Sequence, residues 1–412
     1  MRAPFPGVRS CLAHPRLFRD NPSGVGRADT AYTFAITNMK RLPLFLLFLG
    51  LLASALRADT LTLTAPTDYQ VIQRTSRAGG KILITGRLAS DTRPTALEAR
   101  LTGAGASGAW QPLPFKSDAD EFRSELDAPA GGWFGLEVRA LMNGKILAAT
   151  NVAHLGVGEV FVVAGQSNSA NHGEEKQQPR SGRVAAFNGK LWRPANDPQP
   201  GASGGGGSFL PPFGDALVER FQVPVGLVAT GVGATSVREW LPRGTRFPNP
   251  PTLLGNVTQL ASGEWECKGT IFTNFTTRLK QLGPRGFRAV LWHQGESDAN
   301  QRDPTRTLPG ELYRKFLTQL IHDSRREAGW DAPWFVAQVS YHVPGDEASP
   351  DIRAAQASLW QDGLALEGPD SDALKGDLRE RGGKGVHFSG PGLREHAAKW
   401  VGKVAPWLDA QP

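Results

Sequence analysis

The sequence VFVVAGQSN at residues 160–168 joins a continuous apolar run to a short polar turn. Five apolar residues without alternation, at 160–164, are typical of a strand that is buried on both faces of a sheet. Comparable apolar runs occur at 223–229, 289–292 and 334–339. The segments between these runs carry apolar residues at helical spacing. Strands that alternate with helices predict an α/β domain with a three-layer parallel sheet over residues 156–412.

Polar turns follow the predicted strands of this domain. The turns are GQSN at 165–168, TGVGATS at 230–236 and HQGESD at 293–298, and a further polar loop, GVHFSGPG at 385–392, precedes the last predicted helix. Ligands of parallel sheets bind at the carboxyl ends of the strands. Together these turns supply a nucleophile, donors for an oxyanion and a base, which is the set that acyl transfer requires. Taken alone, a serine in such a turn also fits a helix cap.

These motifs resemble those of the SGNH hydrolases. The segments GQSN at 165–168, WHQGESD at 292–298 and VHF at 386–388 are similar to the branch that contains sialate O-acetylesterases and acetylxylan esterases. The resemblance covers residues 156–412, and its most specific part is the QGESD block. It implies a flavodoxin-like fold and a serine esterase that removes acetyl groups from carbohydrates. The expected substrates are O-acetylated sialic acid, acetylated xylan or other plant or algal glycans.

The same resemblance assigns roles to individual residues. It implies that Ser167 is the nucleophile and His387 is the general base. It further implies an oxyanion hole formed by the backbone amides of Ser167 and Gly233 and by the side chain of Gln294. Members of the family usually have two adjacent glycines where this chain has Gly233 and Ala234. Gly233 is therefore the weakest member of the expected set.

One position departs from the family pattern. Family members usually have an aspartate three residues before the catalytic histidine, and Lys384 stands there in this chain. A lysine cannot accept a hydrogen bond from the imidazole, so His387 needs another carboxylate or acts without one. Glu296, which matches the triad acid of some members of the branch, is the first choice. A serine–histidine dyad is the second and Asp372 the third, while a purely structural role for Glu296 stays open.

Lys384 also keeps open a function of another class, which is a non-catalytic carbohydrate-binding protein on a degenerate esterase scaffold. The presence of Ser167, Gln294 and His387 argues against that alternative. The two functions are distinguished by whether the folded protein releases acetate from acetylated substrates.

Three further residues are candidates for substrate contact, and one further serine is excluded as the nucleophile. Trp192 and Trp240 lie in or near the loops that form the site, where they could stack on a sugar ring or pack in the core. Asn168 is a third candidate for substrate contact. The segment GASGG at 201–205 matches the nucleophile elbow of α/β-hydrolases, but no apolar strand precedes it, so Ser203 is not expected to be the nucleophile. That loop is expected to border the entrance to the site.

Residues 59–155 show a different pattern, with short strand-like runs separated by turn residues. These runs lie at 60–64, 81–86, 96–101 and 135–141, and Asn143-Gly144 separates the last of them from the run at 146–149. Such an Asn-Gly pair between apolar runs predicts a hairpin. Closely spaced strands of this kind predict a small all-β sandwich domain. Because no candidate catalytic residues cluster here, we expect this domain to have an accessory role.

Residues 39–58 have the layout of a secretory signal peptide. Lys40 and Arg41 precede an apolar stretch at 44–52, and small residues follow, so cleavage is expected after Ala55 or Ala58. The apolar stretch is too short to favour a membrane span. The mature protein is therefore expected to be secreted or periplasmic without a stable membrane span. The preceding residues, 1–38, are expected to result from a mis-assigned start upstream of the signal, an unusually long leader being the alternative.

The net charge of +7 does not indicate a nucleic-acid partner. Eight basic and two acidic residues lie within residues 1–58, which leaves +1 for the rest of the chain. Cys11 and Cys267 are the two cysteines, and Cys267 is expected to serve packing. No set of His, Cys and Asp residues has metal-ligand spacing, so neither a metal nor a cofactor is expected. The expected partner is an acetylated carbohydrate.

Overall fold

The computed structural model describes residues 59–116 and 120–412. The predicted signal peptide at 39–58 and the extension at 1–38 therefore lie outside the described residues. The described residues belong to one compact unit. The described part is a mixed α/β structure with a large mixed sheet of eleven strands and two smaller sheets of three strands.

The first part of the described chain consists of strands. They are β1 (Thr60–Ala65), β2 (Gln70–Gln73), β3 (Gly79–Ala89), β4 (Ala96–Thr102), β5 (Gln111–Pro112), β6 (Glu121–Pro129) and β7 (Gly131–Met142). The strands β1, β3 and β6 form an antiparallel sheet, while β4 pairs with β5 and β7, and β7 pairs with β8 (Lys145–Gly165). In β6, buried and exposed residues alternate strictly, as expected for a strand with one face on a core. One apolar cluster contains Ile82, Phe122, Leu97 and Val138 and so joins the two sets of strands.

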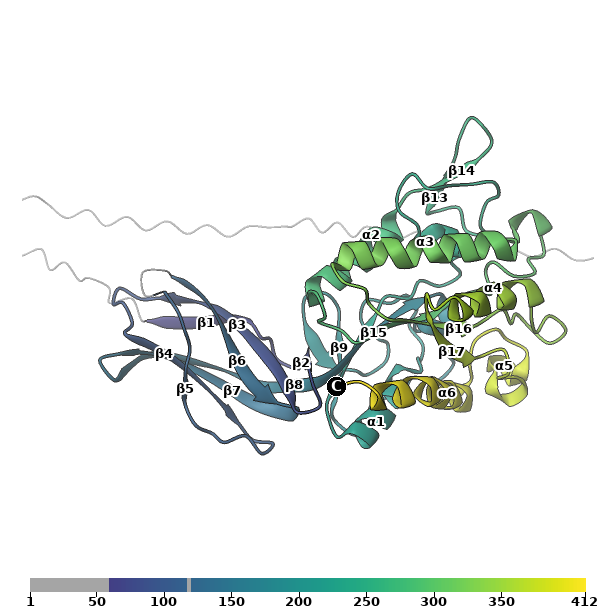
Figure 1. The fold of residues 1–412 in the computed structure, drawn as a ribbon. Coiled ribbons are helices and arrows are strands. Elements are labelled where there is room, and N and C mark those ends of the chain that lie inside the picture. Colours follow the sequence, from purple (N-terminus) through teal and green to yellow (C-terminus); the bar gives the residue numbers. More distant parts are fainter. Residues whose placement is uncertain (1–58, 117–119) are drawn as a thin grey trace, which may run out of the picture. The chain divides into compact units, whose positions relative to one another are not determined.

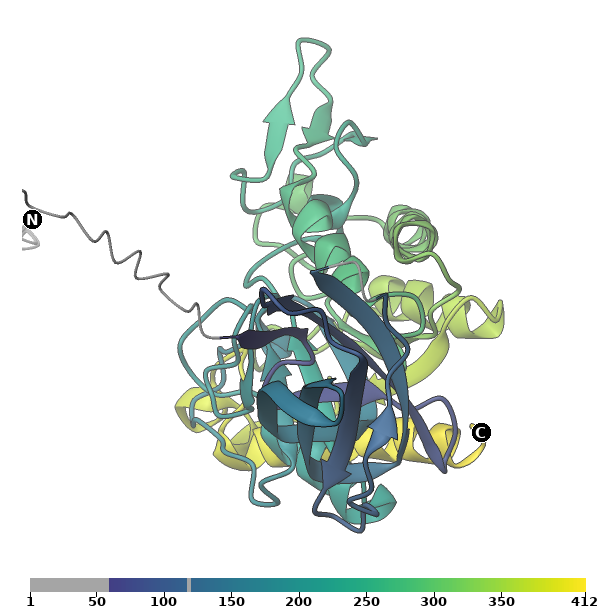
Figure 2. The ribbon, with the colours of Figure 1, turned by 90° about the vertical axis from the view of Figure 1, so that its left-hand side faces the viewer.

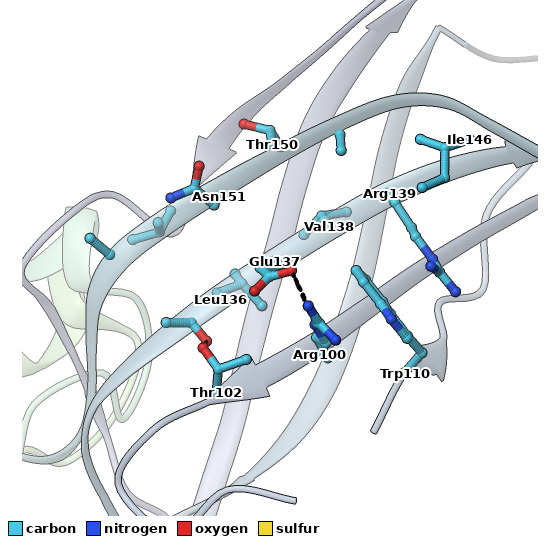
Figure 3. Close-up of a pocket in the computed structure, with 14 residues that line it drawn as sticks. Arg100, Thr102, Trp110, Leu136, Glu137, Val138, Arg139, Ile146, Thr150 and Asn151 are labelled. Carbon is cyan, nitrogen blue, oxygen red and sulfur yellow. Dashed lines mark hydrogen bonds and ion pairs between the residues drawn. The ribbon is translucent and has the colours of Figure 1, made fainter. Parts of the chain in front are cut away.

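A stack of side chains fixes the segment before β5 onto the outer face of β4 and β7 (Figure 3). The guanidinium carbons of Arg100 and Arg139 lie 4.5 Å and 3.8 Å from the ring centroid of Trp110. Arg100 donates to Glu137 at 2.7 Å and Arg139 donates to Glu98 at 2.9 Å. Each cation–π contact at such an exposed site stabilises by about 0.5–1 kcal/mol. Both arginines and the tryptophan therefore have a structural role in this part of the chain.

The second half of β8 is the centre of a parallel sheet. Its further strands are β9 (Val184–Phe187), β11 (Val225–Ala229), β15 (Ala289–His293), β16 (Trp334–Gln338) and β17 (Leu366–Asp370), with β10 (Trp192–Pro194) antiparallel at one edge. The strand order is β10-β9-β11-β8-β15-β16-β17. All of the apolar runs expected to be buried strands, at 160–164, 223–229, 289–292 and 334–339, overlap strands of this sheet.

Two groups of helices cover the parallel strands (Figures 1 and 2). The helices are α1 (Leu210–Phe221), α2 (Thr270–Leu282), α3 (Gly310–Ala328), α4 (Pro350–Gln361), the short α5 (Glu380–Gly383) and α6 (Gly390–Asp409). Residues of α2, α3 and α4 share one apolar cluster with Val160 and Val162 of β8. Residues of α1 and α6 share another with Phe161 and Val163. Successive residues of β8 thus enter opposite clusters, which is why its sequence is apolar without alternation.

A small sheet of β12 (Arg246–Phe247), β13 (Val257–Gln259) and β14 (Trp265–Cys267) projects beside α2 (Figure 1). Cys267 is fully buried and its thiol donates to the carbonyl of Leu241 at 3.1 Å. Burial raises the pKa of this thiol to about 11, so it packs as a neutral side chain. No helix in the described residues is both long and apolar enough to cross a membrane.

A buried carboxylate joins the strand-rich part to the parallel sheet. Glu159 in β8 is fully buried and accepts from Arg74 at 2.6 Å, from Arg288 at 2.7 Å and from Gln73 at 2.9 Å. Two cations and an amide therefore surround one carboxylate, which compensates for its removal from water. The strand that carries Glu159 runs without a break across residues 155 and 156, where the sequence pattern changes.

Candidate active site

The candidate active site lies where the order of the parallel strands reverses. After β8 the chain forms β9, β10 and β11 on one side of β8 and then β15 on the other side. The carboxyl end of β8 therefore lies between those of β11 and β15, which is where ligands of open α/β sheets bind. Gly165 ends β8 with a φ of 129°. A β-carbon there would come within 2.0 Å of the carbonyl oxygen of His293, so the turn that leads to Ser167 requires glycine.

A cavity of about 890 Å³ opens at this position. Residues from several strand ends line it, including Gln166, Ser167, His172, Ser203, Gly233, Glu296, Ser297, His342 and His387. Ser167 is 5 % exposed and begins the short 3₁₀ helix η1 (Ser167–Ser169) directly after β8. The structure thus brings the expected nucleophile and the expected base, 220 positions apart in the numbering, to one cavity.

His387 has a carboxylate partner, and it is Glu380. The Nδ1 atom of His387 lies 2.9 Å from Oε1 of Glu380. The backbone N–H of Glu380 also donates to the carbonyl of His387 at 2.8 Å. Burial lowers the pKa of His387 below 6.5, and the neighbouring Glu380 opposes that shift. The histidine therefore has its Nδ1 occupied, and its Nε2 is the ring nitrogen left for a proton transfer.

A glycine-rich turn creates this contact. Arg381 and Gly382 have positive φ values of 57° and 63°, so the chain reverses directly after Glu380. A β-carbon at Gly385 would come within 2.2 Å of the Cγ atom of Glu380, so the small residue there makes room for the glutamate side chain. Lys384, at the position where the family has its aspartate, belongs to the same turn. The carboxylate that contacts His387 is thus seven residues before it, whereas the family has its aspartate three residues before.

Glu296 does not hold the position expected for it. It is 2 % exposed, and its Oε1 atom accepts from Asn168 at 2.9 Å. Its Oε2 atom is buried without a partner in the described structure. Burial raises the pKa of Glu296 to about 7. Since Glu380 occupies Nδ1 of His387, the expectation that Glu296 orients the histidine is corrected, although Glu296 does line the cavity.

Asp372 and Asn168 have structural contacts of their own. Asp372 accepts from the hydroxyl of Ser340 at 2.7 Å and from Arg353 at 2.9 Å, so it is not the partner of His387 either. Asn168 is 4 % exposed and donates to Glu296 and to the carbonyl of Val386 at 3.2 Å. It does not belong to the lining of the cavity. The expected substrate contact of Asn168 is therefore replaced by a contact that ties η1 to the loop before His387.

The expected oxyanion donors differ in their surroundings. Gly233 lines the cavity, and its backbone N–H donates to the hydroxyl oxygen of Ser203 at 2.7 Å. Gln294 is fully buried, and its Nε2 lies within hydrogen-bond distance of three acceptors, which are Asp298 at 2.7 Å, the carbonyl of Thr235 at 3.1 Å and Oε1 of Gln166 at 3.3 Å. These contacts hold the side-chain amide in place. The oxyanion role of Gln294 stays a prediction.

The two tryptophans expected near the site are core residues. Trp240 is fully buried, and its indole N–H donates to the hydroxyl of Thr235 at 2.9 Å. Trp192 is 7 % exposed and stacks on Phe187 with ring centroids 5.1 Å apart. Neither lines the cavity. Of the two alternatives that the sequence left open, these contacts favour packing in the core for both tryptophans.

The far wall of the cavity carries charged residues. Arg306 pairs with Asp303 at 3.3 Å, and His342 pairs with Asp346 through Nδ1. Arg302, also in the wall, is exposed, and no ion pair among the described residues includes it. Within residues 59–116 and 120–412, no three His, Cys, Asp or Glu side chains converge as metal ligands would. The polar side chains of this wall, with the guanidinium of Arg302 that no described carboxylate pairs with, suit a polar ligand.

Three comparisons place the chain among known proteins. The sequence model of the family described as "Carbohydrate esterase, sialic acid-specific acetylesterase" matches residues 157–395. A solved carbohydrate acetylesterase from Xanthomonas citri is 18% identical with a TM-score of 0.51, and the match covers 81% of this chain and 72% of that one. Because the identity is low, this likeness shows a shared fold. No curated protein matches the sequence.

Two other solved structures are similar to a lower degree. A protein from Arabidopsis thaliana is 18% identical with a TM-score of 0.41, over 62% of this chain and 99% of that one. A family 2 carbohydrate esterase with a carbohydrate-binding domain, from Corynascus thermopiles (Myceliophthora fergusii), is 12% identical with a TM-score of 0.35. That match covers 85% of this chain and 99% of the other.

Proposed function

This chain belongs to the family of sialic acid-specific acetylesterases among the carbohydrate esterases, and on that premise we propose that Ser167, His387 and Glu380 form its catalytic triad. As a member of this family the protein is a carboxylic ester hydrolase that removes acetyl groups from carbohydrates. The observation that supports the triad most directly is the 2.9 Å contact between His387 Nδ1 and Glu380 in the cavity that Ser167 also lines.

In the first half of the proposed reaction, Ser167 attacks the carbonyl carbon of the acetyl ester. His387 accepts the hydroxyl proton at Nε2, and Glu380 stabilises the imidazolium that forms. The carbonyl oxygen becomes an oxyanion, and we assign its stabilisation in part to the backbone N–H of Ser167, the first residue of η1. The imidazolium then returns its proton to the sugar oxygen, the C–O bond breaks, and the sugar alcohol leaves an acetyl group on Ser167.

The second half repeats these roles with water. His387 takes a proton from the water as it attacks the acetyl carbon, and the tetrahedral intermediate collapses. The proton returns to Ser167, and acetate leaves. Every proton transfer in this scheme uses residues of the chain itself.

The experiment that tests the proposal measures acetate release. The purified protein should hydrolyse p-nitrophenyl acetate and at least one member of a panel with O-acetylated sialic acid, acetylated xylan and acetylated cello-oligosaccharides. A folded protein that is inert on all of them would support the carbohydrate-binding alternative. That alternative depended on Lys384, and Glu380 now supplies the carboxylate that Lys384 cannot.

We further propose that an acidic sugar is the preferred substrate. Arg302 is exposed in the cavity wall, and no carboxylate among the described residues pairs with it, while Asp303 and Asp346 are each paired. A guanidinium fork binds a carboxylate with two parallel hydrogen bonds. The carboxylate of a sialic acid would fill that role. The preference predicts a lower KM for O-acetylated sialic acid than for neutral acetylated sugars.

The finer organisation of the chain is proposed in the same way. We propose that residues 156–412 form a flavodoxin-like hydrolase domain, because its parallel strands carry helices of two separate clusters. Residues 59–155 would form an accessory β-sandwich, which the shared apolar cluster of its strands supports. We also propose that residues 39–58 direct export to the periplasm or the medium. N-terminal sequencing of exported material that starts at Leu56 or Asp59 would support this, and one that retains residues 1–38 would contradict it.

A further inference from the structure

The glycine-rich loop at 201–207 lies against the segment that follows η1. Backbone hydrogen bonds join Asn171 to Ser203 at 3.0 Å and Gly207 to Gly173 at 2.8 Å. A β-carbon at Gly204 would come within 2.3 Å of the carbonyl oxygen of Asn171. One at Gly207 would come within 1.8 Å of another carbonyl oxygen of this segment. The glycines of this loop therefore allow a backbone approach that side chains would prevent.

This approach fixes Ser203 in the wall of the active-site cavity. Its carbonyl accepts from the N–H of Asn171, and its own N–H donates to the carbonyl of Gly231 at 2.9 Å, so the backbone is held from two sides. The Ser203 hydroxyl oxygen is 2.7 Å from the N–H nitrogen of Gly233 and 3.1 Å from Nε2 of His172. Both Ser203 and Ser167 line the cavity.

His172 connects Ser203 to the proposed triad. Its ring centroid lies 5.4 Å from that of His387, with 31° between the ring planes. Burial lowers the pKa of His172, the neighbouring His387 lowers it further, and Glu380 opposes the shift. Burial and His387 both favour the neutral form of His172. A neutral imidazole with its hydrogen on Nε2 donates to the Ser203 oxygen.

We propose that the Ser203 hydroxyl is an oxyanion donor of this esterase. A hydroxyl has two acceptor positions and one hydrogen. In this proposal the Gly233 amide and the tautomer of His172 that has its hydrogen on Nε2 fill the two acceptor positions, which leaves the Ser203 hydrogen to donate to the carbonyl oxygen of the bound acetyl ester. No bond to Ser203 forms or breaks in this role. The inference rests on the proposed function, and it gives Gly233 an indirect part, through Ser203, in place of the direct contact expected from the family pattern.

Steady-state kinetics with p-nitrophenyl acetate test this inference. Ser203→Ala should lower kcat about 10²-fold, as the loss of one oxyanion donor does, with KM within about threefold of the wild type. His172→Gln keeps a side-chain N–H that can donate to the hydroxyl, so it should retain most of the activity, whereas His172→Phe should lose most of it. The double variant Ser203→Ala/His172→Phe should be no slower than Ser203→Ala. Ser262→Ala, in the exposed turn between β13 and β14, is the matched control.

The possible outcomes separate this inference from the proposed function. Wild-type kcat in Ser203→Ala would overturn the donor role, and an increased kcat would show that the hydroxyl blocks the Gly233 amide. If the losses in kcat of Ser203→Ala and His172→Phe add up in the double variant, the two residues act independently, and the link through His172 is overturned. This comparison remains decisive if each single variant is less stable than the wild type. A wild-type protein that hydrolyses no acetyl ester would refute the proposed function itself, and this inference with it.

Discussion

Glu380 and His387 are joined at both their backbones and their side chains. The Glu380 N–H donates to the His387 carbonyl at 2.8 Å, and the imidazole Nδ1 contacts the Glu380 carboxylate at 2.9 Å. The backbone contact sets the spacing of the two residues, and the side-chain contact sets the orientation of the ring. The imidazole can therefore rotate only by breaking a hydrogen bond to a carboxylate that is itself largely buried.

Replacement of the nucleophile is the first test. Ser167→Ala should abolish turnover of p-nitrophenyl acetate, with a loss in kcat of at least about 10³-fold, because no other hydroxyl forms the acyl-enzyme. The unfolding temperature should stay close to that of the wild type. A Ser167→Ala protein that still forms a burst of p-nitrophenol would show that another side chain is acylated.

Glu380→Gln should reduce kcat about 10²-fold, because the imidazolium loses its charged partner. The reaction needs neutral His387, so activity falls as the pH decreases through the pKa of that residue, which lies below 6.5. Glu380 raises this pKa, so its removal should move the acidic limb of the pH–rate profile to still lower pH.

Two further variants serve as controls for Glu380. Glu296→Gln should not move the acidic limb, because Glu296 does not contact His387 Nδ1. Lys384→Asp should give no gain in rate, because Glu380 already occupies that nitrogen. A loss with Glu296→Gln and none with Glu380→Gln would reverse the assignment.

Glu296 predicts a pH dependence of stability. Burial raises its pKa from 4.5 to about 7 in the folded protein. Between these values the folded chain keeps a proton that the unfolded chain has released, so the free energy of unfolding decreases as the pH rises. Glu296→Gln removes this contribution. Thermal unfolding should therefore show a gain over the wild type at pH 8 that is absent at pH 4.5, and an equal shift at both values would contradict the buried, protonated state.

Arg302→Ala tests the choice of substrate. If the guanidinium binds the carboxylate of an acidic sugar, the variant should raise KM for O-acetylated sialic acid about tenfold, since a charge-assisted hydrogen bond contributes about 1.5–3 kcal/mol. KM for p-nitrophenyl acetate should not change. Equal effects on acidic and neutral acetylated sugars would leave the acidic preference without support.

Glu159→Ala should destabilise the fold. The substitution leaves Arg74 and Arg288 buried without their shared carboxylate. Removal of one partner of a buried ion pair costs about 3–5 kcal/mol. Chemical denaturation followed by tryptophan fluorescence should show this loss. A change below about 1 kcal/mol would mean that water reaches the two guanidinium groups.

The parallel strands could be predicted because each is buried on both faces. Val160 to Ala164 enter two different apolar clusters in turn, and an unbroken apolar run is the direct consequence. The convergence of Ser167 and His387 on one cavity could also be predicted, because each stands in a distinctive local motif at a strand end or before a helix. Burial of a single aromatic residue has no such local pattern, and so the positions of Trp192 and Trp240 could not be inferred from the sequence.

Glu380 could not be identified from spacing alone. Its contact depends on three consecutive residues with positive φ, at 381–383, and on Gly385, which together bring position 380 beside position 387. The cluster of glycines in RGGKG at 381–385 was the available signal of a tight reversal. The orientation of the Gln294 side chain could not be predicted from the sequence either, because it depends on the hydrogen bond that Asp298 accepts from its amide.

The continuous course of β8 limits how this protein can be divided. Its 21 residues pair with β7 in their first half and with β11 and β15 in their second half. A cut between residues 155 and 156 would sever a paired strand and expose unpaired backbone groups at both new ends. The N-terminal strands are therefore unsuited to exchange with another domain by gene fusion. A shortened enzyme would need to keep these strands or to have the start of β8 redesigned.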